Sequence, residues 1–312
     1  MKKFFLRLQA LVGAGEIPTL DNGRDYGIDA KYMALLVGVA AFSLPIGLRL
    51  SAEAGPAMCA YDSISHYYFS PWMGPVFVGS LFFIGAFLLG YRGLSRGENI
   101  AAGLAGVSTM GVALFPTSGD GCDDPMHRSR AFVDYSIDEA VGPETLIRNE
   151  NWTLLRSLGE FLGFEITTST LHFAFAGVVF FILMIFCLFF FTRIVSDQHR
   201  VNGTLTRAKR LRNAVYLSCG GVMAAMMALI VLHALGYVGH ETVVINGEPV
   251  LTDLWPARNY TFWVEAAMLW CFGLSWALKG RLGWLGDLLL GDLLLDPADK
   301  ADKAARGGTA RP

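Results

Sequence analysis

The 312-residue sequence has little charge, since only 17% of its residues are Asp, Glu, Lys or Arg, whereas soluble domains carry about 25%. Its five Cys exclude a disulfide-dense miniprotein. The net charge of −2 is too balanced for a nucleic-acid-binding protein. Apolar residues dominate instead: 53% of the chain is hydrophobic, with 22 Phe and 35 Gly. This composition predicts an all-α, polytopic membrane helix bundle whose partner is membrane lipid; a homo-oligomer is compatible with it.

Six segments are long and apolar enough to cross a membrane, which takes about 20 residues. They lie near residues 31–50, 72–91, 99–116, 170–192, 213–236 and 259–278. The distribution of Lys and Arg indicates the orientation, because cytoplasmic loops are enriched in both. With the N-terminus inside, the cytoplasmic segments hold nineteen of the twenty-five Lys and Arg. We therefore predict six transmembrane helices in a bacterial plasma (inner) membrane, with both termini cytoplasmic.

The chain divides into three parts around these spans. Residues 1–30 are predicted to be a cytoplasmic interfacial segment, 31–278 the six-helix transmembrane domain, and 279–312 a cytoplasmic interfacial helix with a disordered tail. The transmembrane domain includes a structured outer loop over 117–169, in which Leu and Phe recur at helical spacing over 154–162. Asn246-Gly247 suits a type I′ turn and predicts a hairpin in the last outer loop.

One carboxyl group stands out, because Glu265 is the single ionisable residue well inside a predicted span. A carboxylate there costs a few kcal/mol unless it is protonated or paired, so it faces the bundle interior and marks function. His172 and His233 lie at comparable depth in the fourth and fifth spans, and His66 precedes the second. We predict that these four residues converge on one polar cavity open to the outer face. The alternative is a Glu–His or Glu–Tyr hydrogen bond that only fixes helix packing.

Two further clusters precede or follow spans on the same side. In residues 63–68, Ser65 and His66 are a candidate nucleophile and base, while Tyr67 and Tyr68 are expected in an interfacial aromatic belt. In residues 120–127, Asp120 and the nearby acidic residues and His are candidate acid–base or metal-ligating groups. The better interpretation of that second cluster is a turn rich in Asp, Gly and Pro.

Cys59 and Cys122 are the two outer cysteines, while the other three lie within predicted spans. An oxidising exterior favours a disulfide between them. Such a bond would tie the segment that carries Ser65 and His66 to the segment that carries Asp120.

Short motifs in the spanning region resemble a known group of proteins. These are the run from Ser63 to Phe69, Val78-Gly-Ser-Leu-Phe, Gly111-Val-Ala-Leu-Phe-Pro-Thr117 and Leu171-His-Phe-Ala-Phe-Ala. Together they resemble uncharacterised bacterial six-helix membrane proteins grouped as a domain of unknown function. They are distantly similar to eukaryotic multi-pass proteins of the autophagy-modulator and GPI-lipid-remodelling kind. Alkaline-ceramidase-like hydrolases use a C-terminal His-x-x-x-His pair that is absent here, so their zinc mechanism is not carried over.

Three functional hypotheses remain. The first is a hydrolase or transferase acting on lipid or lipid-linked substrates, with Ser65, His66, Asp120 and Glu265 as catalytic groups and a divalent metal such as zinc on His66, His172 and His233. The second is a proton- or ion-coupled transporter that uses Glu265. The third is a non-catalytic scaffold or sensor, or a haem-binding protein with His172 and His233 as axial ligands.

Overall fold

The computed structural model is mostly helical. It describes residues 30–52, 60–70, 72–117, 134–137, 146–149, 157, 159–161, 163, 166–193, 200–201, 204–205, 207–245 and 248–280. The long helices are α2 (Ala30–Ser51), α3 (Met73–Gly90), α4 (Arg96–Leu114), α6 (Thr168–Ile185), α7 (Arg207–Ala234) and α8 (Tyr260–Lys279). A short 3-10 helix, η1 (Ser65–Phe69), precedes α3, and a π-helical segment, η2 (Phe186–Phe190), extends α6.

Five of the described helices are long and apolar enough to span a membrane. They are α2, α3, α6 together with η2, α7 from Lys209 onward, and α8. All five fall on predicted spans. The remaining predicted span, 99–116, is also a helix, but α4 is not among the five. Its first turn contains Arg96, Glu98 and Asn99, which lower its hydropathy, although it packs between α3 and α6.

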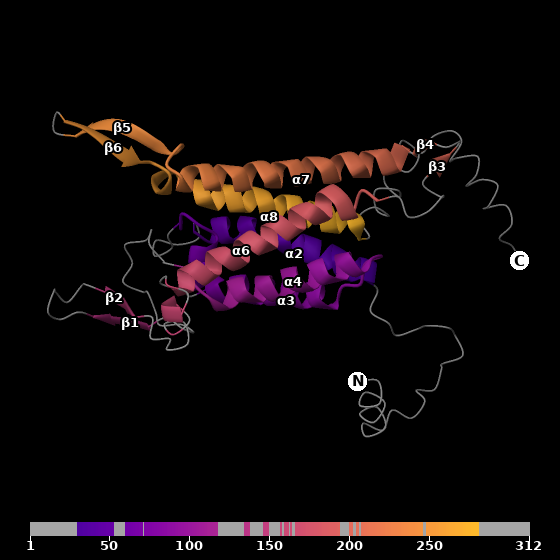
Figure 1. The fold of residues 1–312 in the computed structure, drawn as a ribbon, viewed down its shortest axis with the longest axis horizontal. Coiled ribbons are helices and arrows are strands. Elements are labelled where there is room, and N and C mark those ends of the chain that lie inside the picture. The colour runs from indigo at the N-terminus through magenta and orange to yellow at the C-terminus, as the bar shows by residue number, and fades with distance from the viewer. Residues whose placement is uncertain are drawn as a thin grey trace, which may run out of the picture.

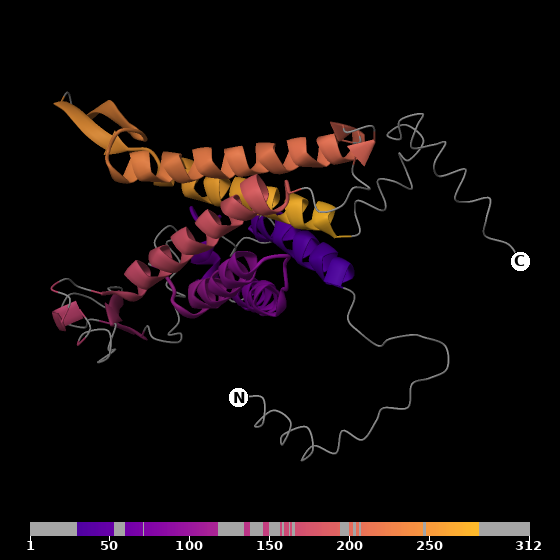
Figure 2. The ribbon, with the colours of Figure 1, turned by 45° about the vertical axis from the view of Figure 1, so that its right-hand side comes forward.

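The helices form an elongated bundle with two distinct ends (Figures 1 and 2). In both views α7 lies along α8, and α6 runs obliquely to them. Hairpins β1–β2 and β5–β6 lie at one end of the bundle, and β3–β4 lies at the other (Figure 1). The end with β5–β6 corresponds to the predicted outer face, and we call it the hairpin end. We call the opposite end, where α7 begins, the basic end, because Arg92, Arg193, Lys209 and Lys279 lie at the helix ends there.

Small residues let the helix axes approach closely. A Cβ placed on Gly38 of α2 would lie 2.5 Å from the backbone nitrogen of Ala277 in α8, and one on Gly106 of α4 would lie 2.8 Å from the carbonyl oxygen of Gly85 in α3. These pairs bring backbone against backbone, as small residues do in membrane bundles. Gly221 of α7 differs, because a Cβ there would meet nothing within 4 Å.

The hairpin predicted from Asn246-Gly247 is confirmed. Strands β5 (His240–Ile245) and β6 (Glu248–Asp253) pair antiparallel with Ile245 opposite Glu248, which leaves a two-residue connection. In the predicted outer loop, β1 (Asp134–Ile137) pairs with β2 (Leu146–Asn149). The other short pair is β3 (Arg200–Val201) with β4 (Thr204–Leu205). The amphipathic helix expected over 154–162 lies mostly outside the described residues.

Candidate active site

A short segment before α3 enters the hairpin end of the bundle and is held there by α8. The carbonyl oxygen of Asp62 accepts a hydrogen bond from the backbone N–H of Phe262 (2.7 Å), one of the four free N–H groups in the first turn of α8. One turn further on, Glu265 Oε2 accepts hydrogen bonds from the Ser63 hydroxyl (2.8 Å) and the Ile64 N–H (2.7 Å). Glu265 therefore fixes the backbone immediately before Ser65.

Ser65 itself is hydrogen-bonded to a histidine on another helix. Its Oγ lies 2.8 Å from Nε2 of His172, and both side chains are buried. The second ring nitrogen of His172, Nδ1, lies 2.7 Å from the carbonyl oxygen of Phe115. A carbonyl only accepts, so Nδ1 carries the proton and Nε2 of the neutral ring is the acceptor. The Ser65 hydroxyl thus donates to His172, as a nucleophile does to its general base.

The local sequence explains why the Phe115 carbonyl is available. Helix α4 ends at Leu114, and the final carbonyls of a helix have no partner within it. Phe115 is extended (φ −101°, ψ 103°), as a residue before proline prefers, and Pro116 follows. His172 lies in the first turns of α6 beside this point, so its Nδ1 bonds to the Phe115 carbonyl, which orients the ring.

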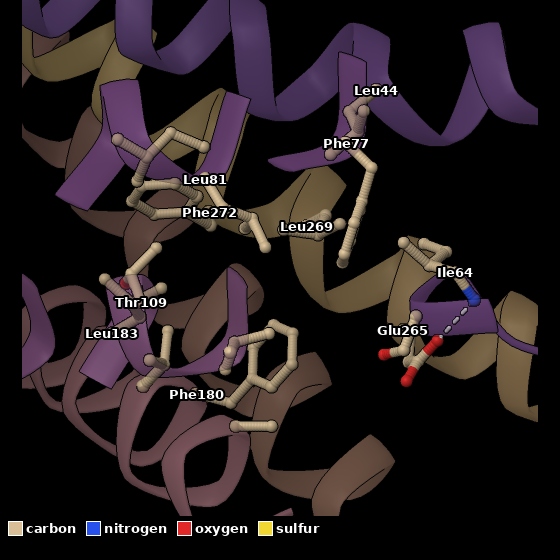
Figure 3. A pocket seen from close by; sticks show the side chains of 15 residues that line it. Leu44, Ile64, Phe77, Leu81, Thr109, Phe180, Leu183, Glu265, Leu269 and Phe272 are labelled. Carbon is tan, nitrogen blue, oxygen red and sulfur yellow. Dashed lines mark hydrogen bonds between the residues drawn. The ribbon is translucent and has the colours of Figure 1, made fainter. Parts of the chain in front are cut away.

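A narrow apolar cavity extends from this site into the bundle. Its volume is about 50 Å³, room for about three to five water-sized groups. It is lined by residues from α2, α3, α4, α6, α8 and the segment before α3, and the lining extends from Phe77 to Ile84 along α3 and from Glu265 to Phe272 along α8. Seven residues of helix correspond to about 10 Å of length. Glu265 and Ile64 lie at one end, and Leu81, Leu183 and Phe272 at the other (Figure 3). The cavity suits a slender apolar chain with a polar head at Ser65.

His66 is adjacent to Ser65 but is directed elsewhere. Its Nδ1 is hydrogen-bonded to Oδ1 of Asp62, one turn earlier in the same segment. The histidine hydrogen-bonded to Ser65 is therefore His172 rather than the neighbouring His66 that the sequence suggested. Since Glu265 binds Ser63 and Ile64, the predicted hydrogen bond between Glu265 and a histidine is not found among the described residues.

Of the four residues predicted to converge on one polar cavity, Glu265 lines the apolar cavity, whereas none of the three histidines is among its described lining residues, so that prediction is wrong for them. His233 lies in a separate cluster. Its ring stacks on Trp255 (centroids 4.1 Å apart, planes 9° apart), and its Nδ1 lies 3.1 Å from the carbonyl oxygen of Val238. Its Nε2 lies 3.8 Å from Oδ2 of Asp253 at the end of β6. The end of α7 thus uses His233 to anchor the β5–β6 hairpin.

The metal and haem hypotheses do not fit these contacts. Across the part of the chain that the structure describes, no three His, Cys, Asp or Glu side chains are grouped to hold a metal ion. Both ring nitrogens of His172 already have partners, Ser65 and Phe115. His172 is therefore not a free axial or zinc ligand, and His66 and His233 belong to other clusters.

The tyrosines next to His66 are buried, which corrects the prediction of an interfacial belt. Tyr67 is 1% and Tyr68 7% exposed, whereas the following Trp72 is 72% exposed. Tyr67 packs edge-on against Tyr61 (4.9 Å between centroids) and near Phe262 of α8 (6.1 Å). Burial raises the pKa of the Tyr67 hydroxyl. The aromatic side chains of η1 therefore fix the segment that carries Ser65.

Asp120, His127, Cys59 and Cys122 lie outside the described residues. The predicted role of Asp120 and the Cys59–Cys122 disulfide stay predictions. The cysteines expected in spans, Cys187, Cys219 and Cys271, are free thiols.

A buried carboxylate at the basic end was missed. Glu98 is 2% exposed, and its Oε1 accepts from the Tyr91 hydroxyl (2.7 Å) while its Oε2 accepts from the Leu94 N–H (3.1 Å). Arg193 approaches Oε2 to 3.9 Å. The signal was Ser95-x-x-Glu98, since the Ser95 hydroxyl caps α4 by accepting from the Glu98 N–H (3.2 Å).

Comparison of the chain with protein-family models, with curated proteins and with solved structures finds no match. The resemblance to bacterial six-helix proteins therefore stays a prediction from short motifs.

Proposed function

We propose that the chain is a membrane-embedded hydrolase or transferase of lipid acyl groups, with Ser65 as nucleophile and His172 as general base. The observation that carries the proposal is the hydrogen bond from Ser65 Oγ to His172 Nε2 (2.8 Å), with Nδ1 held by the Phe115 carbonyl. Nucleophile, base and an orienting third group in this order are the signature of covalent catalysis.

The reaction follows from the positions of these groups. As Ser65 Oγ attacks an acyl carbonyl carbon, its proton passes to His172 Nε2 and an acyl-serine forms. His172 then gives that proton to the leaving group, which is the oxygen of an alcohol or the nitrogen of an amine. Water in a hydrolase, or a second alcohol in a transferase, regenerates Ser65 by the reverse proton transfers. The apolar cavity holds the acyl chain, as apolar linings with few polar groups do.

We further propose that all six helices span a bacterial plasma membrane, with both ends of the chain cytoplasmic and Ser65 near the outer face. The charge bias supports this orientation. Helix α4 packs between α3 and α6, so neighbouring helices shield much of its less apolar sequence from lipid.

Labelling with an alkyl fluorophosphonate, which phosphonylates activated serines, tests the proposed reaction. In detergent-purified, monodisperse protein, peptide mass analysis should find the adduct on Ser65. Ser65→Ala and His172→Ala should lose the adduct, whereas Ser108→Ala, which alters another buried serine, should keep it.

The same contacts would also suit a purely structural role, in which Ser65 and His172 join two helices. In that case the folded wild-type protein would show no adduct on Ser65, and His172→Ala would only lower the unfolding temperature. Absence of labelling in folded protein would therefore refute the catalytic proposal.

A further inference from the structure

Acyl transfer at Ser65 needs a hydrogen-bond donor for the oxyanion that forms on the carbonyl oxygen. Backbone N–H groups beside the nucleophile usually serve, but here they are already bonded. The Ile64 N–H donates to Glu265, and the Ser65 N–H donates to the Ser63 hydroxyl oxygen (3.1 Å). The His66 N–H donates to the Ser63 carbonyl (3.3 Å). These three N–H groups are therefore not available, and a side chain that lines the cavity is the candidate donor.

The described cavity lining contains three polar side chains: Ser65, Thr109 and Glu265. Ser65 is the nucleophile. The Thr109 hydroxyl donates to the carbonyl of Ala105 (2.7 Å), which uses its hydrogen. Glu265 is left as the side chain whose second oxygen, Oε1, lacks a hydrogen-bond partner among the described residues.

The hydrogen bonds of Glu265 determine where its proton resides when it is neutral. The Ser63 oxygen accepts from Ser65, so its own hydrogen is directed to Glu265 Oε2, which also accepts from Ile64. With two donors on Oε2, a proton on the carboxyl group must be on Oε1.

The surroundings favour the neutral form of Glu265. The titratable groups that interact electrostatically with it are His66 and Asp62, which bind one another. Among the described residues Glu265 has no ion pair with Lys or Arg. A carboxyl group in an apolar cavity at membrane depth, without such a partner, takes up a proton.

We propose that neutral Glu265 donates its Oε1 proton to the carbonyl oxygen of the substrate and binds the oxyanion. As Ser65 Oγ bonds to the carbonyl carbon, the carbonyl π electrons move to oxygen, and Oε1–H stabilises them there. The electrons return when the leaving group departs. This inference rests on the proposed function and deepens it.

The same arrangement indicates the class of substrate. The described lining has no cationic side chain, so a free carboxylate has no counter-charge there. An uncharged acyl ester offers a carbonyl to Glu265 and an alkyl chain to the cavity. We therefore assign neutral acyl esters, rather than free fatty acids, as substrates.

The test compares three forms of the full chain in detergent, with p-nitrophenyl octanoate as substrate. Glu265→Gln keeps an oxygen to accept from Ser63 and Ile64 and presents an N–H donor to the cavity. Glu265→Leu presents no donor. We expect turnover of Glu265→Gln to be within about 10-fold of wild type, and turnover of Glu265→Leu to fall about 10²- to 10³-fold, as for loss of one oxyanion donor.

If Glu265→Gln loses as much turnover as Glu265→Leu, the carboxylate form is required and the inference is wrong. Wild-type turnover in a folded Glu265→Leu variant would also overturn it. Should Glu265→Leu fail to fold, Glu265→Ala, which likewise presents no donor, takes its place in the comparison with Glu265→Gln. Labelling of wild-type Ser65 by the fluorophosphonate is measured separately. Its absence refutes the proposed function, whereas its presence with a failed Gln–Leu comparison refutes only the role of Glu265.

Discussion

Replacing Tyr91 by Phe tests how the buried carboxylate at the basic end is stabilised. The Tyr91 hydroxyl donates to Glu98 Oε1 at 2.7 Å, and its ring packs against Trp276 (5.1 Å between centroids) and Phe186 (5.9 Å). Phe keeps the ring contacts and removes only the hydroxyl. Loss of a hydrogen bond to a charged group costs about 1.5–3 kcal/mol. At about 2–4 °C per kcal/mol for a chain of this order of size, the unfolding temperature should fall by about 3–12 °C.

The assay can use the protein's own cysteines. Cys187 is 1% and Cys219 5% exposed, so a thiol-reactive fluorogenic dye reports unfolding of detergent-purified protein. Tyr260→Phe is the matched control, because within the described part of the chain the Tyr260 hydroxyl has a hydrogen bond only with the exposed Arg258 (3.1 Å). Its effect should be within about 0.5 kcal/mol. In a Glu98→Gln background, Tyr91→Phe should lower the free energy of unfolding by only about 1 kcal/mol, the value for a hydrogen bond between uncharged groups. A Tyr91→Phe shift no larger than that of Tyr260→Phe would refute the reasoning.

Three further predictions concern packing, the disulfide and orientation. Gly38→Leu should lower the free energy of unfolding by about 1–3 kcal/mol or more, because its Cβ would meet the α8 backbone, whereas Gly79→Leu, with open space around it, should have little effect on the same dye assay. Cys59 and Cys122 should resist alkylation without reductant in protein from an oxidising compartment, as intact mass shows; free alkylation of both would contradict the disulfide. In an otherwise cysteine-free chain, a cysteine introduced at Gly247 should be labelled by an impermeant maleimide in intact cells, while one placed between β3 and β4 should not; the opposite pattern would invert the orientation.

The helices were predictable because each is encoded locally. A run of apolar residues long enough to cross a membrane gives the same signal wherever its neighbours lie, and five such runs are helices long enough to span. The Asn246-Gly247 hairpin was likewise set by two residues and the strands beside them. Helix α4 is the intermediate case, because its polar first turn belongs to a local cap at Ser95 rather than to a span.

The residues of the candidate site could be selected from the sequence, but the hydrogen bonds between them could not. Ser65, His172 and Glu265 were all identified, yet Ser65 and His172 are 107 positions apart. Which histidine meets the serine depends on how α6 packs beside the end of α4, and local sequence does not encode that. His66 was the obvious partner by adjacency, but one helical turn directs it to Asp62 instead. Nothing in the sequence indicated that the carbonyl of Phe115 would orient His172.

Ser65 and His172 are attached to different helices, so the distance between their side chains depends on how those helices lie relative to one another. Asp62, Ser63 and Ile64 bind the serine segment to α8, whereas His172 belongs to α6 and is oriented by the end of α4. Helix α2 packs on α8, and α4 packs on both α3 and α6, so the 2.8 Å bond joins the segment held by α8 to a histidine on α6. A thinner or thicker bilayer changes helix tilt. We therefore expect the distance between Ser65 Oγ and His172 Nε2 to respond to bilayer thickness.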